Sequence, residues 1–174
     1  MTCAVLKMTT MPSMPSQRQR SQDLTPEGGL GEAALKHIIG YQLAQATITT
    51  TEVFQTQVGG PFDLRPVEFT VLTLIHENPG VSGKQLARAL AVTPPNITMW
   101  IDRLEGRALV TRERSATDGR AQHLRVTPQG ATLARNAVQR LLDGERQALA
   151  ALSPGERAIL VELLHKAAIS RKTP

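Results

Sequence analysis

A cluster of arginines lies in the middle of the 174-residue chain. Residues 107–125 contain five arginines and two acidic residues, so this short segment has a net charge of +3, more than half of the +5 of the whole chain. Guanidinium groups bind phosphates and base edges through charge-assisted hydrogen bonds. The cluster therefore indicates a polyanionic partner.

Asp118-Gly119-Arg120 stands between two short segments whose apolar residues alternate, 109–114 and 123–127. Asp-Gly favours a tight reversal, because glycine adopts positive φ without steric cost and aspartate can bond to its own backbone. The pattern predicts a small β-hairpin with Arg120 near its tip. The alternative for Arg120 is a solvated charge on a loop.

Other site chemistries have no support in the sequence. The single cysteine, Cys3, cannot form an internal disulfide, and there is no phosphate-binding glycine loop or nucleophile elbow. The histidines are too far apart for a metal-ligand motif: His37, His76, His123 and His165. We expect no enzyme activity, no bound metal and no cofactor.

The elements that must position the arginines are mainly helices. Residues 1–28 are rich in Ser, Thr, Pro, Gln and Gly and are expected to form a disordered tail. Residues 29–174 are expected to form one domain. Apolar residues at helical spacing predict long helices over 30–58 and within 128–172. A smaller lobe is expected over about 62–127.

The lobe contains the pattern of two short helices joined by a tight turn. Ser82 and Gln85 have the spacing of a capping box, and Thr93-Pro94 is typical of the start of a second helix. In the preceding helix, Val67, Val71, Leu72 and Ile75 are expected to form the buried face. This order predicts a helix-turn-helix followed by the hairpin as a wing, a unit whose second helix can enter a DNA major groove.

From about Leu30 to Lys172 the chain resembles the MarR family of bacterial transcriptional regulators. The resemblance is carried by LRPVEFTVLTLI and by QLARALAVTPPNITMWIDRLEGRALVTRERSATDGRAQHLRVTPQG. The most specific matches are Asp102-Arg103-Leu104-Glu105, the Asp118 and Arg120 pair, Val126-Thr127 and Gly130. The resemblance implies a homodimer in which N- and C-terminal helices interlock. Two winged helix-turn-helix lobes would then bind a palindromic operator in double-stranded DNA.

The resemblance and the residue types together select a DNA-binding surface. Asparagine can pair with adenine, threonine and methionine can contact a thymine methyl, and arginine can bind guanine or phosphate. Many members of the family have arginine where Met99 stands, and this departure favours less reading of guanine. The candidates are Thr93, Pro95, Asn96, Thr98, Met99, Arg103, Arg112, Arg114, Asp118 and Arg120.

Two alternatives apply within this surface. Asn96 could instead help to cap its helix. Arg112 and Arg114 could point away from DNA or pair with Glu105 and Glu113. Arg120 resembles the family arginine that enters the minor groove, where a narrow groove enhances the negative potential.

Family members often bind small aromatic, phenolic or carboxylate effectors that release DNA. The resemblance therefore implies a regulator controlled by such a ligand, with repression the commoner behaviour in the family and activation the alternative. His37, Tyr41 and Trp100 are the amphipathic residues that could lie near an effector. The alternative is that they serve the core and the dimer interface.

A different kind of function would also fit a winged helix. The fold could act as a protein-protein adaptor or antirepressor that does not bind DNA, but such a protein has no need of the Asp118 and Arg120 pattern. No apolar run approaches the roughly 20 residues of a membrane helix. The expected location is therefore the cytoplasm.

Overall fold

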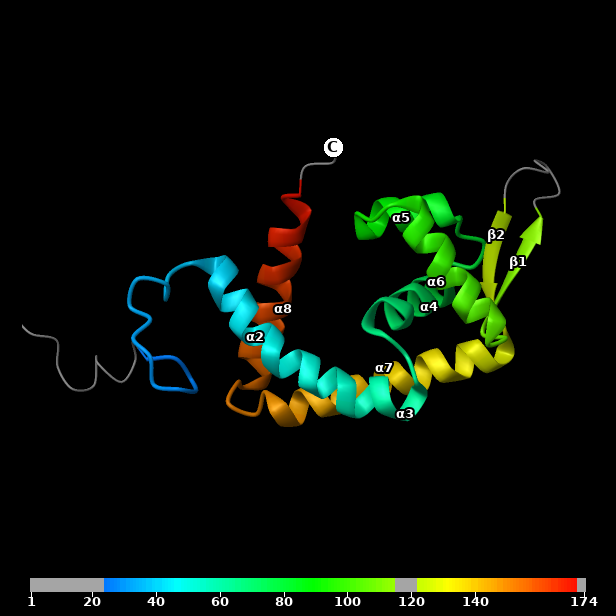
Figure 1. The fold of residues 1–174 in the computed structure, drawn as a ribbon. Helices are drawn as coiled ribbons and strands as arrows, with labels where there is room; N and C mark the ends of the chain where they lie inside the picture. Colours follow the sequence, from blue (N-terminus) through cyan, green and yellow to red (C-terminus); the bar gives the residue numbers. More distant parts are fainter. Residues whose placement is uncertain (1–23, 115–121, 172–174) are drawn as a thin grey trace, which may run out of the picture. The chain divides into compact units, whose positions relative to one another are not determined.

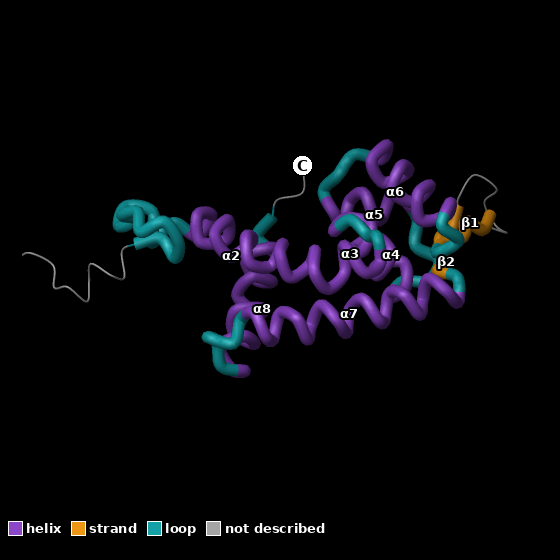
Figure 2. The backbone as a smooth tube through the Cα atoms, turned by 60° about the horizontal axis from the view of Figure 1, so that its bottom comes forward, coloured by secondary structure: helices purple, strands orange, loops and turns teal. Residues whose placement is uncertain are grey.

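The computed structural model describes residues 24–114 and 122–171, which fall into two units divided between Thr47 and Ile48. Figure 1 shows the order of the elements, and Figure 2 shows that helices dominate and that the two strands form one small hairpin. The elements are α2 (Ile39–Phe54), the π-helical turn η1 (Gln55–Gly59), α3 (Gly60–Phe62), α4 (Pro66–Glu77), α5 (Gly83–Leu90), α6 (Pro94–Gly106), β1 (Val110–Arg114), β2 (Gln122–Val126), α7 (Pro128–Ala148) and α8 (Pro154–Ile169). The expected class, mainly α with a small β-hairpin, is confirmed.

The first long helix starts later than the sequence pattern predicts, at Ile39 instead of Leu30. Residues 33–37 form turns, with hydrogen bonds that span three residues, such as Leu35 N to Glu32 O at 2.8 Å. The side-chain amide of Gln42 donates to the Lys36 carbonyl at 2.9 Å, which satisfies an acceptor outside the helix. Local hydrogen bonds therefore compete with the apolar periodicity before Ile39.

The same helix ends later than predicted. The glycines at 59 and 60 keep right-handed helical φ and ψ, and the chain continues through η1 and α3 to Phe62. A proline inside an α-helix clashes with the carbonyl four residues before it, and the wider π turn preceding Pro61 relieves this crowding. The break comes at Asp63, which adopts the left-handed conformation with φ of 49°.

The predicted helix-turn-helix is formed by α5 and α6. Ser82 caps α5 through a reciprocal capping box with Gln85, as the spacing predicts. Ala91 makes the turn in the left-handed conformation with φ of 53°. Thr93 stands at the N-cap position of α6, but its hydroxyl accepts no capping hydrogen bond.

The burial of two neighbouring residues of α4, Val67 and Glu68, differs from what the apolar pattern predicts. Val67, expected in the buried face, is 36% exposed, whereas Glu68 is 3% exposed. Glu68 turns inward because its carboxylate accepts a hydrogen bond from Arg65 N at 3.0 Å and faces Arg103 on α6. Val71, Leu72 and Ile75 are fully buried, as predicted.

The wing hairpin is tied to the rest of the lobe on both sides. Its strands pair antiparallel with Arg112 opposite Leu124. Val81, which precedes α5, adds a short bridge to Leu124 that the sequence pattern did not reveal. Thr127 caps α7 by accepting from Gly130 N at 2.9 Å, and its hydroxyl also donates to Ala108 O at 2.8 Å.

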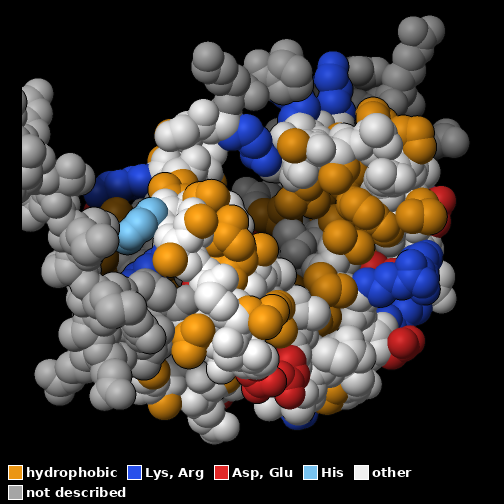
Figure 3. Space-filling view, turned by 60° about the vertical axis from the view of Figure 1, so that its left-hand side comes forward, with side chains coloured by type: hydrophobic (Ala, Val, Ile, Leu, Met, Phe, Trp, Pro, Cys, Tyr) orange, Lys and Arg blue, Asp and Glu red, His pale blue; other side chains and the backbone are white. Residues whose placement is uncertain are grey.

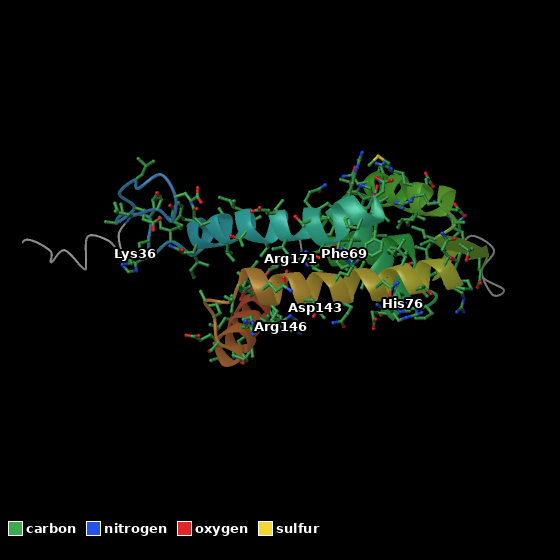
Figure 4. The ribbon with its side chains drawn as sticks, turned by 90° about the horizontal axis from the view of Figure 1, so that it is seen from below. Lys36, Phe69, His76, Asp143, Arg146 and Arg171 are labelled. Atoms are coloured by element: carbon green, nitrogen blue, oxygen red, sulfur yellow. The ribbon has the colours of Figure 1, made fainter. Side chains whose placement is uncertain are left out.

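The core of the larger unit consists of aliphatic side chains from α4, α5, α6, the wing and α7. Helix α7 packs on α4 and η1, and Phe69 of α4 meets Phe54 edge to face with ring centroids 5.7 Å apart. Asp143 and Arg146 form an exposed ion pair on α7 (Figure 4). The lobe therefore packs against α7 through α4 and η1.

Helix α8 has no buried residue, although more than half of its residues are apolar. Figure 3 shows groups of hydrophobic side chains at the surface of the molecule. Ser153 caps α8, and its hydrogen bonds hold the pKa of Glu156 below the usual value. None of the helices in the described ranges is long and apolar enough to cross a membrane. The exposed apolar residues of α8 are Ile159, Leu160, Val161, Leu163, Leu164 and Ile169.

Candidate nucleic-acid interface

Helix α6 has one face in the core and the opposite face at the surface. Ile97, Ile101 and Leu104 are 1–3% exposed, as the helical spacing predicts. Because these residues fix the rotation of the helix, the opposite side chains must point outward. The exposed set is Pro95, Asn96, Thr98, Met99, Asp102 and Arg103.

A shallow groove runs along the exposed face of α6. Its lining is mostly apolar, and Met99, one of the lining residues, is 46% exposed. An α-helix that presents such a face has the dimensions to enter a DNA major groove, about 12 Å wide. The lining residues are Pro94, Pro95, Thr98, Met99, Asp102 and Arg103.

The polar side chains at the start of α6 differ in whether they form hydrogen bonds within the protein. Asn96 donates its backbone N–H to Thr93 O at 3.1 Å, but its side-chain amide forms no hydrogen bond within the described ranges. The Thr98 hydroxyl donates to Pro94 O at 3.1 Å. Of these side chains, Asn96 and Thr93 therefore keep donors or acceptors available for a partner.

Two arginines of the central cluster, Arg107 and Arg125, bind other groups of the lobe. Arg107 donates to the carbonyls of Phe62 and Asp63, at 2.8 Å and 2.5 Å, and thus ties the α3–α4 turn to the end of α6. Arg125 binds Glu113 across the hairpin at 2.8 Å. The pair of Arg125 and Glu113 neutralises part of the charge that the sequence assigned to a polyanionic partner, and the carbonyls hold Arg107 inside the lobe.

Arg112 also binds carboxylates of the protein. Its Nη1 lies 2.6 Å from Glu105 Oε2, and its Nη2 contacts the Asp102 carboxylate. Its side chain is 25% exposed. The pair with Glu105 was one of the sequence alternatives, and it joins the wing strand β1 to α6.

Arg103 forms an ion pair with the buried carboxylate of Glu68. The distance from Arg103 Nε to Glu68 Oε1 is 3.2 Å, and the two side chains are 46% and 4% exposed. The sequence pattern assigned no role to Glu68. Glutamate at the third position of a helix is a capping signal, and this was the one indication that its carboxylate turns back toward the helix start.

The tip of the wing lies outside the described residues. Asp118 and Arg120 belong to that segment. Arg114 pairs with Gln122 through the strand backbone. The interface described here therefore consists of α5, α6 and the base of the wing.

Two basic residues of α5 were missed as candidates. Lys84 and Arg88 are exposed and one helical turn apart, opposite the buried Leu86 and Ala87. Neither forms an ion pair with another described residue. The first helix of a helix-turn-helix crosses the DNA backbone, so these cations suit phosphate contacts. Their spacing on the polar face was the available signal.

The three effector candidates belong to different units, each described by itself. In the first unit, His37 is exposed, and the Tyr41 hydroxyl donates to Glu32 Oε2 at 2.5 Å. This hydrogen bond to a carboxylate raises the pKa of Tyr41. In the second unit, Trp100 is half-buried against the core. Among the described residues there is no group of three His, Cys, Asp or Glu side chains that could hold a metal.

Comparison with known proteins shows which family this chain is similar to. Residues 64–121 match the model of the MarR family. A candidate transcriptional regulatory protein for the hcr operon of Thauera aromatica is 29% identical over 128 residues, which cover 74% of this chain and 77% of the relative.

Solved structures agree in fold over most of the chain. The transcriptional repressor CouR, bound to a 23-mer DNA duplex, is 31% identical with a TM-score of 0.72, covering 82% of this chain and 99% of CouR. A MarR family protein of Mycobacterium tuberculosis in complex with salicylic acid is 26% identical with a TM-score of 0.62. That match covers 77% of this chain and 98% of the mycobacterial one.

Proposed function

Because the chain belongs to the MarR family of DNA-binding transcriptional regulators, we propose that it is a homodimeric repressor of a palindromic operator. The observation that carries the proposal is the division of α6 into a buried face and an exposed face beside the wing. In this proposal Thr93, Pro95, Asn96, Thr98, Met99 and Arg103 face the major groove. Operator binding would occur in the cytoplasm.

The dimer is supported by the helices that the lobe leaves uncovered. Helix α8 exposes large apolar side chains, among them Leu163 at 56% and Val161 at 67%. In the other unit, Leu35 and Ile38 are also exposed. A helix that exposes a row of large apolar side chains, as α8 does, is typical of an interface between copies. A twofold dimer would present two lobes to half-sites about one helical turn apart.

The wing supplies the remaining contacts in this proposal. Arg120 is assigned to the minor groove, with Asp118 supporting the turn. Arg114 is assigned to the phosphate backbone. Arg112 is assigned to the DNA-binding surface as well. It binds the carboxylates of Asp102 and Glu105 on α6 and so joins the wing to that helix.

The proposed effector is a small aromatic or phenolic carboxylate. The salicylic acid complex of the mycobacterial relative supports this chemical class. His37, Tyr41 and Trp100 are proposed to contribute to its site. Release of DNA requires that the effector bind the DNA-competent and DNA-incompetent states with different affinity.

Binding to the DNA that flanks its own gene tests the proposal. A mobility-shift titration and footprint should give a protected palindrome, and salicylate or a related compound should release it. Arg120→Ala should weaken binding and lower the slope of log K against log salt by about one unit. Arg146→Ala is the control, because Arg146 lies on α7 and pairs with Asp143. Absence of a shift at low salt would instead favour an adaptor that does not bind DNA.

A further inference from the structure

The exposed face of α6 offers few polar groups that could read a base. Its groove is lined by two prolines and Met99 together with Thr98, Asp102 and Arg103. Direct readout in the major groove depends on donors and acceptors that match those of the base edges. Which bases α6 can distinguish therefore depends on whether each polar side chain is already bonded within the protein.

Two of the three polar lining residues are already bonded within the protein. The Thr98 hydroxyl donates its proton to Pro94 O at 3.1 Å. The Asp102 carboxylate contacts the guanidinium of Arg112. Neither group is positioned to donate a hydrogen bond to guanine.

Arg103 is anchored as well. Its Nε lies 3.2 Å from Oε1 of Glu68, which is buried in the lobe. A bidentate contact with guanine needs two N–H groups directed at O6 and N7 of one base. The ion pair with Glu68 draws the guanidinium toward α4. In this inference the two outer nitrogens of Arg103 are assigned to a phosphate and not to a guanine. The other lining residues of the groove, Pro94, Pro95 and Met99, are apolar.

The thymine C5-methyl is the apolar group that base pairs expose in the major groove. We propose that Met99 and Pro95 on α6 recognise thymine methyl groups, so that the operator half-site is read at A·T pairs and not at guanines. This inference rests on the proposed function, since it names the base chemistry of the same interface. Asn96, whose amide is available, can pair with adenine and so supports the same type of base pair.

Removal of single methyl groups from the DNA tests the inference. Deoxyuridine replaces each thymidine of the footprinted operator in turn, which changes one methyl to hydrogen and keeps base pairing. Loss of one buried methyl is expected to weaken binding about three- to fivefold at one or more positions per half-site. Substitutions outside the footprint serve as the DNA control.

Protein variants test whether Met99 is the residue that senses the loss of the thymine methyl. Met99→Ala should bring the thymidine-to-deoxyuridine affinity ratio at the sensitive position close to one, while Met99→Leu should preserve it. Met99 is 46% exposed, so both variants are expected to fold, which circular dichroism checks. A ratio unchanged by Met99→Ala would overturn the assignment.

A second DNA series distinguishes reading of thymine methyl groups from reading of guanine. 7-Deazaguanine removes the N7 acceptor and should leave binding unchanged within the half-site. Sensitivity to 7-deazaguanine without sensitivity to deoxyuridine would show that α6 reads guanine and overturn the inference alone. Failure of the wild-type protein to bind any duplex would overturn the proposed function and the inference with it.

Discussion

Arg103 Nε on α6 lies 3.2 Å from Oε1 of Glu68 on α4, and the glutamate side chain is only 4% exposed. The other carboxylate oxygen accepts a hydrogen bond from Arg65 N at 3.0 Å. One buried carboxylate therefore caps α4 and anchors a side chain of the proposed DNA-reading helix. A buried charge depends strongly on its partner, whereas a half-exposed arginine can return to water.

This asymmetry gives a testable order of stabilities. Glu68→Gln keeps an acceptor for Arg65 N and should lower the free energy of unfolding by about 1 kcal/mol. Arg103→Ala leaves the buried carboxylate unpaired and should cost more, about 2–3 kcal/mol. Urea unfolding measures both. Glu162→Gln is the control, since its pair with Lys166 is over 60% exposed on both sides and should contribute less than about 0.5 kcal/mol. Equal losses for Glu68→Gln and Arg103→Ala would contradict the order.

The pair of Arg112 and Glu105 should couple the wing to α6. The two side chains are 25% and 39% exposed, so solvent screens the interaction in part. In a double-mutant cycle with Arg112→Ala and Glu105→Gln, we expect a coupling energy of about 0.5–1 kcal/mol. The free energies of unfolding from urea titrations supply the cycle.

The same arginine variant also tests direct contact with DNA. Because both Nη atoms of Arg112 bind carboxylates, Arg112→Ala should leave the salt dependence of operator binding nearly unchanged. A fall of the slope by about one unit would show instead that Arg112 contacts a phosphate. Arg120→Ala provides the comparison within the same titration.

Residues close in sequence were the predictable part of this fold. The capping box of Ser82 and Gln85 is present as predicted, because it depends on two residues only three positions apart. The buried face of α6 also follows from helical spacing alone. The candidate recognition surface could be predicted for this reason.

Features that depend on distant partners were not predictable. Glu68 is buried because it forms an ion pair with Arg103, which comes from another helix. The prediction that Val67 is buried was wrong for the same reason, since α4 turns Glu68 inward instead. Arg107 looked like part of a basic surface, yet carbonyls of Phe62 and Asp63 bind it. Charge counted along the chain does not reveal which charges the fold will pair.

Gly130 allows α7 to approach the strand that leads into the wing. A Cβ built at this position would lie 2.0 Å from Leu109 O, an acceptor for Thr127 N. Backbone atoms cannot yield as a side chain does, so Gly130→Ala should lower the free energy of unfolding by about 2–3 kcal/mol. Gly106→Ala is the matched control, since nothing lies within 4 Å of its added Cβ. It should leave stability unchanged or raise it by up to about 1 kcal/mol. Thermal unfolding at equal protein concentration compares the two, and a tolerated Gly130→Ala would contradict the close approach.

Helix α8 should lose its partner when a charge is placed on its apolar surface. Leu163 is 56% exposed in the single chain, and an aspartate there would have to be desolvated in a dimer interface. Leu163→Asp is therefore expected to shift sedimentation velocity from dimer toward monomer at micromolar concentration. Glu162→Ala, on the same helix, is the control and should remain dimeric. The monomeric variant should also bind the full operator at least about tenfold more weakly, because the second half-site no longer benefits from a linked lobe. If Leu163→Asp sediments as the wild type does, α8 is not the dimer interface.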